Sequence, residues 1–176
     1  MEPCDVLGDG LLLRPHAPAD VAQLEVIALD PEIARWNPIT EPSVAEWSAN
    51  RLDWGKGDHA SWIIASASDR STVRGAISLH HIDLAQLNGE LGYWVAPDHR
   101  GAGLGGQAAR TVARWGFDVL GLRRIQLFHS LGNEASCRVA TAAGFRYEGT
   151  HRQSFRRGDG PFQDEHCHAK ISDDPD

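Results

Sequence analysis

The apolar residues in the middle of the chain recur every three to four positions. They are Leu104, Ala108, Val112, Trp115 and Val119. This spacing places them on one face of an α-helix. Gly121 follows the last of them, and glycine often ends a helix because it readily adopts a left-handed backbone. The pattern therefore predicts a helix over residues 103–120.

Shorter runs rich in β-branched and aromatic residues flank this helix and predict strands. There are seven, at residues 10–14, 61–67, 73–82, 90–95, 124–129, 145–155 and 166–171. Turn-like residues 68–71 separate the second run from the third, which indicates a hairpin. Strands that form a meander before the helix and alternate with helices after it are typical of an α+β fold, with helices on the faces of a mixed sheet.

Three further segments carry signals for the beginning of a helix. Pro18-Ala19-Asp20 precedes an apolar-periodic run, Ser43 is a candidate N-cap for a helix reaching about residue 54, and Asn133 is one for residues 133–143. Residues 30–42 contain three prolines, and we expect them to form an irregular connection.

Composition supports one folded domain over residues 1–176. The chain is 41% hydrophobic and 23% charged, which is enough to bury a core and still form a pocket. Its 24 acidic residues outnumber its 17 basic ones, and the basic residues are scattered. Because nucleic-acid binding requires a concentrated positive face, we expect no nucleic-acid partner.

The cysteines and the apolar segments indicate the compartment. The three cysteines are an odd number and form no CxxC pair, so we expect neither a disulfide framework nor a cysteine zinc site. The first residues lack the pattern of a signal peptide, and no apolar stretch approaches membrane-spanning length. A reducing, cytoplasmic setting without a membrane partner is therefore expected.

A glycine-rich turn opens the predicted central helix. The segment comprises Arg100, Gly101, Ala102, Gly103, Leu104, Gly105 and Gly106. Residues without Cβ let backbone N–H groups surround an anion, and the N-terminus of a helix adds a partial positive charge. A phosphate or pyrophosphate is thus the expected ligand, because a tight turn alone would explain only one or two of the glycines.

Two nucleotide motifs resemble this turn but lack the required context. The dinucleotide fingerprint requires glycine directly at the strand end and an acidic residue about 20 positions later. Here residues 96–100 intervene, and Gln126 and His129 occupy the later positions. No Gly-Lys-Ser/Thr follows, as a nucleoside-triphosphate loop would need. The pyrophosphate of an acyl-CoA is the ligand that is left.

An ordered set of motifs runs from Leu12-x-Arg14-Pro15 through Arg100-x-x-Gly103-x-Gly105 to the segments 122–127, 133–139 and 144–149. This set resembles the GNAT superfamily of N-acetyltransferases, and is most similar to its branch of RimJ/RimL-type ribosomal-protein N-terminal acetyltransferases. It covers nearly the whole chain. The resemblance implies a GNAT-like, mostly antiparallel sheet of about seven strands, with acetyl-CoA as the co-substrate.

The resemblance also implies positions for the co-substrate. In the family, the strand before the glycine turn and the strand after its helix splay apart, and the pantetheine arm lies between them. The implied binding residues are Trp94, Val95, Ala96, Arg100, Gly101, Ala102, Gly103, Leu104, Gly105, Gly106, Asn133 and Ser136. Asn133 is equally well explained as a helix N-cap.

Direct attack of an amine on the thioester needs a base, an oxyanion donor and a proton for the thiolate. Glu90 is the first choice for the base, ahead of His80, His81 and Asp83. The backbone N–H of Val95 is the family-type oxyanion donor. Ser136 is expected to meet the sulfur, because Ala140 stands where some relatives have a tyrosine general acid.

Two groups of side chains have structural as well as functional interpretations. His166 and His168 share one face of the last strand, and with His80 and His81 they could supply metal ligands. No cysteine or carboxylate stands at ligand spacing, so we expect no metal. The tryptophans in the first half of the chain could form an aromatic wall for the acceptor, although core packing is favoured. They are Trp36, Trp47, Trp54 and Trp62.

The leading hypothesis is acetyl transfer from acetyl-CoA to a peptide or protein N-terminal α-amine, in a ternary complex. The alternatives are acetylation of a small-molecule amine, such as a polyamine or an aminoglycoside-like compound, and a non-catalytic acyl-CoA-binding module. In this family, edge strands often pair between subunits, so a homodimer is a further expectation.

Overall fold

The computed structural model describes residues 1–8, 10–156 and 159–175. Its strands form one eight-stranded sheet in the order β1-β2-β3-β4-β5-β6-β8-β7. β5 and β6 are parallel, and the other neighbouring strands are antiparallel. The strands are β1 (Val6–Leu7), β2 (Leu11–Arg14), β3 (Ala60–Ser66), β4 (Gly75–Asp83), β5 (Asn88–Val95), β6 (Arg124–Ser130), β7 (Arg146–Arg156) and β8 (Phe162–Ile171).

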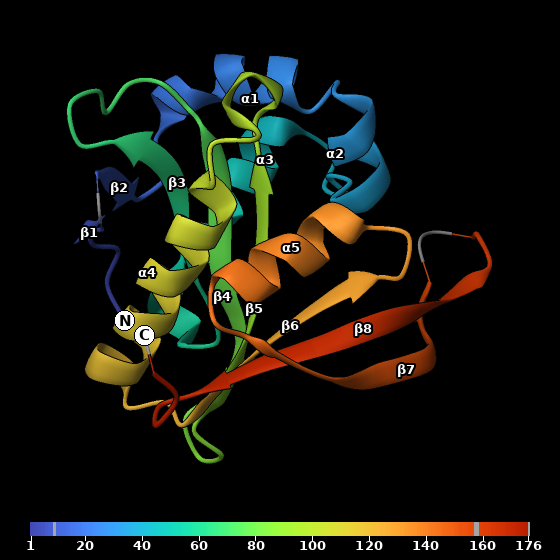
Figure 1. Cartoon of the computed structure of the whole chain (residues 1–176). Coiled ribbons are helices and arrows are strands. Elements are labelled where there is room, and N and C mark those ends of the chain that lie inside the picture. The colour runs from blue at the N-terminus through green and yellow to red at the C-terminus, as the bar shows by residue number, and fades with distance from the viewer. Residues whose placement is uncertain (9, 157–158, 176) are drawn as a thin grey trace.

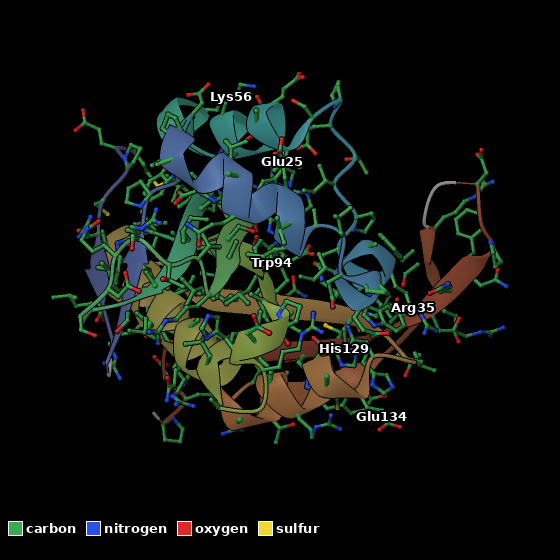
Figure 2. All side chains as sticks on the ribbon, turned by 90° about the horizontal axis from the view of Figure 1, so that it is seen from above. Glu25, Arg35, Lys56, Trp94, His129 and Glu134 are labelled. Atoms are coloured by element: carbon green, nitrogen blue, oxygen red, sulfur yellow. The ribbon has the colours of Figure 1, made fainter. Side chains whose placement is uncertain are left out.

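The helices cover the two faces of this sheet. They are α1 (Val21–Ile27), α2 (Pro31–Trp36), α3 (Val44–Asn50), α4 (Leu104–Leu120) and α5 (Glu134–Ala142), and single 3₁₀ turns lie at Pro18–Asp20, Trp54–Lys56 and Pro97–His99. Figure 2 shows α1 and α3 on one side of the sheet and α4 and α5 on the other. The β7–β8 hairpin extends from the body as a long arm (Figure 1). The expected α+β architecture is confirmed.

The sheet contains one strand more than predicted. β1 is only two residues long and pairs with β2 through Val6↔Leu13 and Leu7↔Leu12. A two-residue strand is too short to show alternation in the sequence. β8 also begins at Phe162 rather than at residue 166, because the polar residues that precede His166 obscure the strand pattern.

The central helix and the core follow the apolar pattern. Along α4, Ala108, Val112 and Trp115 are buried, whereas Val119 at the end of the predicted stripe is 62% exposed. Gly121 ends the helix with a left-handed backbone, φ 69°. Trp115 packs against Trp54 and Trp62, with ring centroids 6.2 and 5.0 Å away. Core packing is therefore the role of these tryptophans, as favoured from the sequence.

The prediction of an irregular connection over residues 30–42 is wrong, because α2 lies within it. Asp30 caps this helix, its carboxylate accepting a hydrogen bond from the backbone N–H of Ile33 at 3.0 Å. Pro31 occupies the first helical position, where proline stabilises a helix because no N–H is needed there. The next helix begins at its predicted cap, Ser43, but ends at Asn50 rather than near residue 54.

Within the described residues, no helix is long and apolar enough to cross a membrane.

Candidate active site

The site is built around a fork between β5 and β6. These parallel strands pair only through Asn88↔Arg124, Gly89↔Ile125 and Glu90↔Gln126. β5 continues to Val95 and β6 to Ser130, but the two strands do not pair with each other beyond Glu90. The separation leaves backbone groups of both strands facing a gap, and it begins at Glu90.

The N–H of Val95 points into this fork. The neighbouring Ala96 N–H donates to the Arg74 carbonyl at 2.9 Å, and Val95 lies opposite Gly75 in β4. Successive N–H groups of a strand point to opposite edges. The N–H of Val95 is therefore directed away from β4, toward the edge from which β6 has separated. That direction fits a donor to an oxyanion in the gap.

The glycine turn leads directly into α4. Gly103 is the N-cap, with a φ of 75°, and no side chain caps this helix start in the described structure. The first intrahelical bond is from Gln107 N–H to the Gly103 carbonyl, 3.1 Å, so the preceding N–H groups are available to an anion. Gly105 is also required by packing, since a Cβ there would lie 3.2 Å from both Tyr93 Cε2 and Val139 Cγ2.

Three of the residues expected beside the co-substrate have other contacts. Arg100 Nη2 forms an ion pair with Asp30 at 2.6 Å, and its Nε donates to the Val95 carbonyl at 3.1 Å. Trp94 packs against Trp47 with ring centroids 6.4 Å apart, on the side of α1 (Figure 2). Ala96 is buried. Any contact of Trp94 with an arm in the fork must therefore come from its backbone.

Asn133 and Ser136 lie at the beginning of α5. Asn133 caps the helix, its Oδ1 accepting from the Ser136 N–H at 3.1 Å, so its N-cap interpretation is confirmed. Ser136 is buried, and its Oγ accepts a hydrogen bond from the Tyr93 hydroxyl at 3.1 Å. Burial raises the pKa of Tyr93 to about 12, although the bond to Ser136 opposes the shift. The phenol is therefore a proton donor at neutral pH.

Tyr93 is a site residue that the sequence analysis missed. The signal for it was available in strand alternation, because Leu91 and Tyr93 share the face that packs on α4. The family resemblance places a tyrosine general acid at position 140 on α5, where this chain has Ala140. The fold instead supplies one from β5, on the other side of the fork.

Glu90 forms a cluster with two histidines of β4. Its carboxylate oxygens lie 3.3 Å from His80 Nε2 and 3.2 Å from His81 Nδ1. Burial raises the pKa of Glu90, but the bonds and charges of the two histidines outweigh burial and lower it below its usual value. Glu90 is therefore ionised at neutral pH, and it is a stronger attractor of a cation than an acceptor of its proton.

A cavity of about 470 Å³ lies on the same side of the sheet as α1 to α3. Its walls include aromatic, hydroxyl and ionisable side chains, among them His16, Trp47, Asp58, Ser78, His80, His81, Tyr93 and Trp94. Trp47 thus contributes to an aromatic wall, stacked under the Arg51 guanidinium at 3.9 Å. The volume is ample for the end of a peptide or a small amine.

The histidine pairs expected from the sequence do not come together. His80 and His81 cluster with Glu90, whereas His166 and His168 cluster with His129 and Cys137 on another part of the sheet. The fold thus brings Cys137 within ligand distance of these histidines, which the spacing of the sequence does not reveal.

A family model described as an acetyltransferase (GNAT) domain matches residues 10–146. The chain belongs to the GNAT family of acetyltransferases. YdaF of Bacillus subtilis (strain 168), which carries the name of a ribosomal N-acetyltransferase, is 30% identical over 145 residues, 80% of this chain and 79% of YdaF. This GNAT protein is an N-acetyltransferase with acetyl-CoA as its acyl donor.

Solved structures share the fold at low sequence identity. Mycobacterium smegmatis RimJ in complex with CoA-disulfide has a TM-score of 0.82 at 22% identity, covering 98% of this chain and 90% of that one. Spermidine N-acetyltransferase from Vibrio cholerae, in complex with CoA and spermine, has a TM-score of 0.78 at 19% identity, covering 94% and 97%.

The residues of this GNAT chain fit acetyl-CoA at three points. The uncapped beginning of α4 suits the pyrophosphate. The β5–β6 fork leaves strand edges free for the amide groups of pantetheine. The Tyr93–Ser136 pair lies beside the fork and offers two hydroxyl groups there.

Proposed function

We propose that this enzyme acetylates the N-terminal α-amine of a peptide or protein, as a single catalytic domain. The observation that carries the proposal is the placement of Glu90. It stands where β5 and β6 separate, and it hydrogen-bonds with His80 and His81, both of which line the 470 Å³ cavity. A cationic amine in the cavity would thus meet a carboxylate at the opening toward the thioester.

In this proposal the turn of residues 100–106 and the beginning of α4 bind the pyrophosphate. The N–H of Val95 donates to the oxyanion that forms when the amine attacks the thioester. Ser136 donates its hydroxyl proton to the departing thiolate while Tyr93 passes its own proton to Ser136 Oγ, and the Tyr93 phenolate then recovers a proton from solvent. Trp94, Val95 and Ala96 flank the arm, as does the N-terminus of α5 at Asn133.

Glu90 and His80 share the work at the acceptor amine. The ionised carboxylate attracts and orients the ammonium group. His80, hydrogen-bonded to it at 3.3 Å, takes the proton directly or through a water, because histidine is the side chain best suited to exchange protons near neutral pH. The amine is then neutral and can attack.

The intrinsic basicity of the acceptor favours an α-amine. An α-amine with a pKa of about 8 is roughly one-tenth neutral at pH 7, whereas a lysine with a pKa of about 10.4 is neutral to about four parts in ten thousand. The difference corresponds to about 3 kcal/mol. A site whose carboxylate is held ionised is better matched to the amine that loses its proton more easily. The name of the relative YdaF agrees with a ribosomal protein as the acceptor.

The test is a free-thiol assay with acetyl-CoA and a panel of acceptors. Peptides with free N-termini should release thiol, and the same peptides with blocked N-termini but free lysines should not. Glu90→Gln should lower the rate. Glu25→Gln, at an exposed position of α1, should leave the rate unchanged. Failure of every α-amine peptide to react would refute the proposed acceptor.

A polyamine is the second candidate, favoured by a second carboxylate near Glu90. Burial and the charge of Glu90 raise the pKa of Glu165, although the Ser154 hydroxyl opposes the shift. Two neighbouring carboxylates suit a chain of spaced ammonium groups, and the fold neighbour from Vibrio cholerae was solved with spermine. Turnover of spermidine with peptides left untouched would decide for this candidate. Binding of acetyl-CoA without turnover of any amine would instead indicate a non-catalytic module.

A further inference from the structure

Four side chains with metal-binding atoms converge beneath α5. His129 comes from β6, Cys137 from α5, and His166 and His168 from β8, and their ligand atoms all lie within 4.8 Å of one another. His129 and His166 are directly opposite in the antiparallel pair, and His168 is opposite Leu127. The three histidines therefore share the face that α5 covers, where Figure 2 shows His129.

The measured separations match the edges of a tetrahedral zinc site. His129 Nε2 lies 3.3 Å from His168 Nε2, and Cys137 Sγ lies 3.8 Å from the same His168 nitrogen. Zinc–nitrogen bonds of about 2.0–2.1 Å and zinc–sulfur bonds of about 2.3 Å give tetrahedral edges of about 3.4 Å between nitrogens and about 3.6 Å between nitrogen and sulfur. The atoms need to move by only a few tenths of an ångström along these two edges.

The histidines are prepared to act as ligands. His129 Nδ1–H donates to the Ser130 carbonyl at 3.0 Å, which leaves the Nε2 lone pair facing the cluster, as in many metal sites. His166 Nδ1 is buried without a hydrogen-bond partner among the described residues.

We propose that His129, Cys137, His166 and His168 bind one Zn²⁺ ion in a closed tetrahedral site. Three imidazoles and a thiolate supply the nitrogen and sulfur ligands that zinc prefers. Binding deprotonates the Cys137 thiol and releases the proton to solvent. The ion then joins α5 to β6 and β8, which are already paired with each other in the sheet.

The site adjoins the proposed catalytic machinery without being part of it. Cys137 follows Ser136 in the first turn of α5, so the ion would restrain the helix that carries the hydroxyl. The ligand set is closed, with four protein atoms, and leaves no position for a substrate. We therefore expect the ion to have a structural role. Its binding can be measured whether or not the proposed acceptor is correct.

The experiment is a Co²⁺ titration of the full chain after removal of metals by a chelator. One equivalent should produce the visible bands of tetrahedral Co²⁺ and a near-ultraviolet thiolate-to-metal charge-transfer band. Cys137→Ser should abolish the charge-transfer band and weaken Zn²⁺ binding about 100-fold or more, measured by competition with a chromophoric chelator. Cys167→Ser is the matched control, because Cys167 is buried between His166 and His168 on the opposite face of β8 and should keep the band.

His166→Ala gives a second measure that does not depend on the thiol, since His166 is only partly buried. It should keep the circular dichroism spectrum of the native protein and lose the tetrahedral bands. Absence of one-equivalent binding to the native chain would overturn the proposal in favour of a hydrogen-bonded histidine network. A charge-transfer band that persists in Cys137→Ser, or that disappears in Cys167→Ser alone, would do the same.

Discussion

The hydroxyl of Tyr93 on β5 donates a hydrogen bond to Ser136 Oγ on α5, 3.1 Å away, beside the gap that β5 and β6 leave between them. In the proposed mechanism, this bond links the two walls of the site where the thiolate is protonated. The raised pKa of Tyr93, about 12, keeps its proton in place throughout the pH range of an activity assay. In the proposed mechanism the two hydroxyls therefore act as one relay.

Tyr93→Phe and Ser136→Ala should each lower kcat by about 10- to 100-fold. This lies at the low end for general acid catalysis, because a thiolate is already a fair leaving group. If they form one relay, the double variant should lose no more than the worse single variant, which steady-state thiol release will measure. KM for acetyl-CoA should change little. Losses that multiply in the double variant would show that the hydroxyls act separately.

Ala102→Asp should weaken acetyl-CoA binding by about tenfold or more. Ala102 is an exposed residue of the turn before α4, and a carboxylate there would repel the pyrophosphate at short range. Ala102→Asn has nearly the same shape without the charge and serves as the control, with calorimetry as the measurement. Equal affinity of the two variants would place the pyrophosphate away from this turn.

Glu90→Gln should lower kcat/KM for a cationic acceptor by about 100-fold without abolishing the acidic limb of its pH profile. The pKa of Glu90 lies below its usual 4.5, so the carboxylate stays ionised from neutral pH down to about pH 5. A fall in rate over that range must therefore come from another group. A limb that disappears in Glu90→Gln would identify Glu90 as the titrating base.

His16 should make the protein less stable as the pH falls from about 6.5 to about 3. Burial lowers the pKa of His16 from 6.5 to about 3, whereas the unfolded chain takes up this proton near 6.5. The unfolded state therefore binds more protons within that window, and acidification favours it. The contribution is fully present above pH 6.5, and its loss is about 1 kcal/mol per pH unit.

The measurement is the free energy of unfolding in urea at several pH values. His16→Gln should reduce the slope of stability against pH in that window, while His151→Gln, at an exposed position, should keep it. An unchanged slope in His16→Gln would mean that the buried ring is protonated in the folded state, through its contact with the Ser48 hydroxyl at 3.0 Å.

Many helices and strands of this protein could be predicted from its sequence because the signals for them are local. The apolar stripe of α4 and its closing Gly121 specify the helix, because both signals act within a few residues. The caps Ser43 and Asn133 were correct for the same reason. α2 was missed because proline can break a helix or begin one, and Asp30 at its N-cap was the signal that distinguishes the two.

The tertiary structure decided which distant side chains meet. Tyr93 and Ser136 are 43 residues apart, and they meet because β5 and β6 separate beyond Glu90 and α5 packs beside the gap. Cys137 joins three histidines because the β6–β8 register sets His129 opposite His166. Propensity and periodicity report on a few neighbouring positions, whereas strand register and the packing of a helix on a sheet depend on contacts along the whole chain.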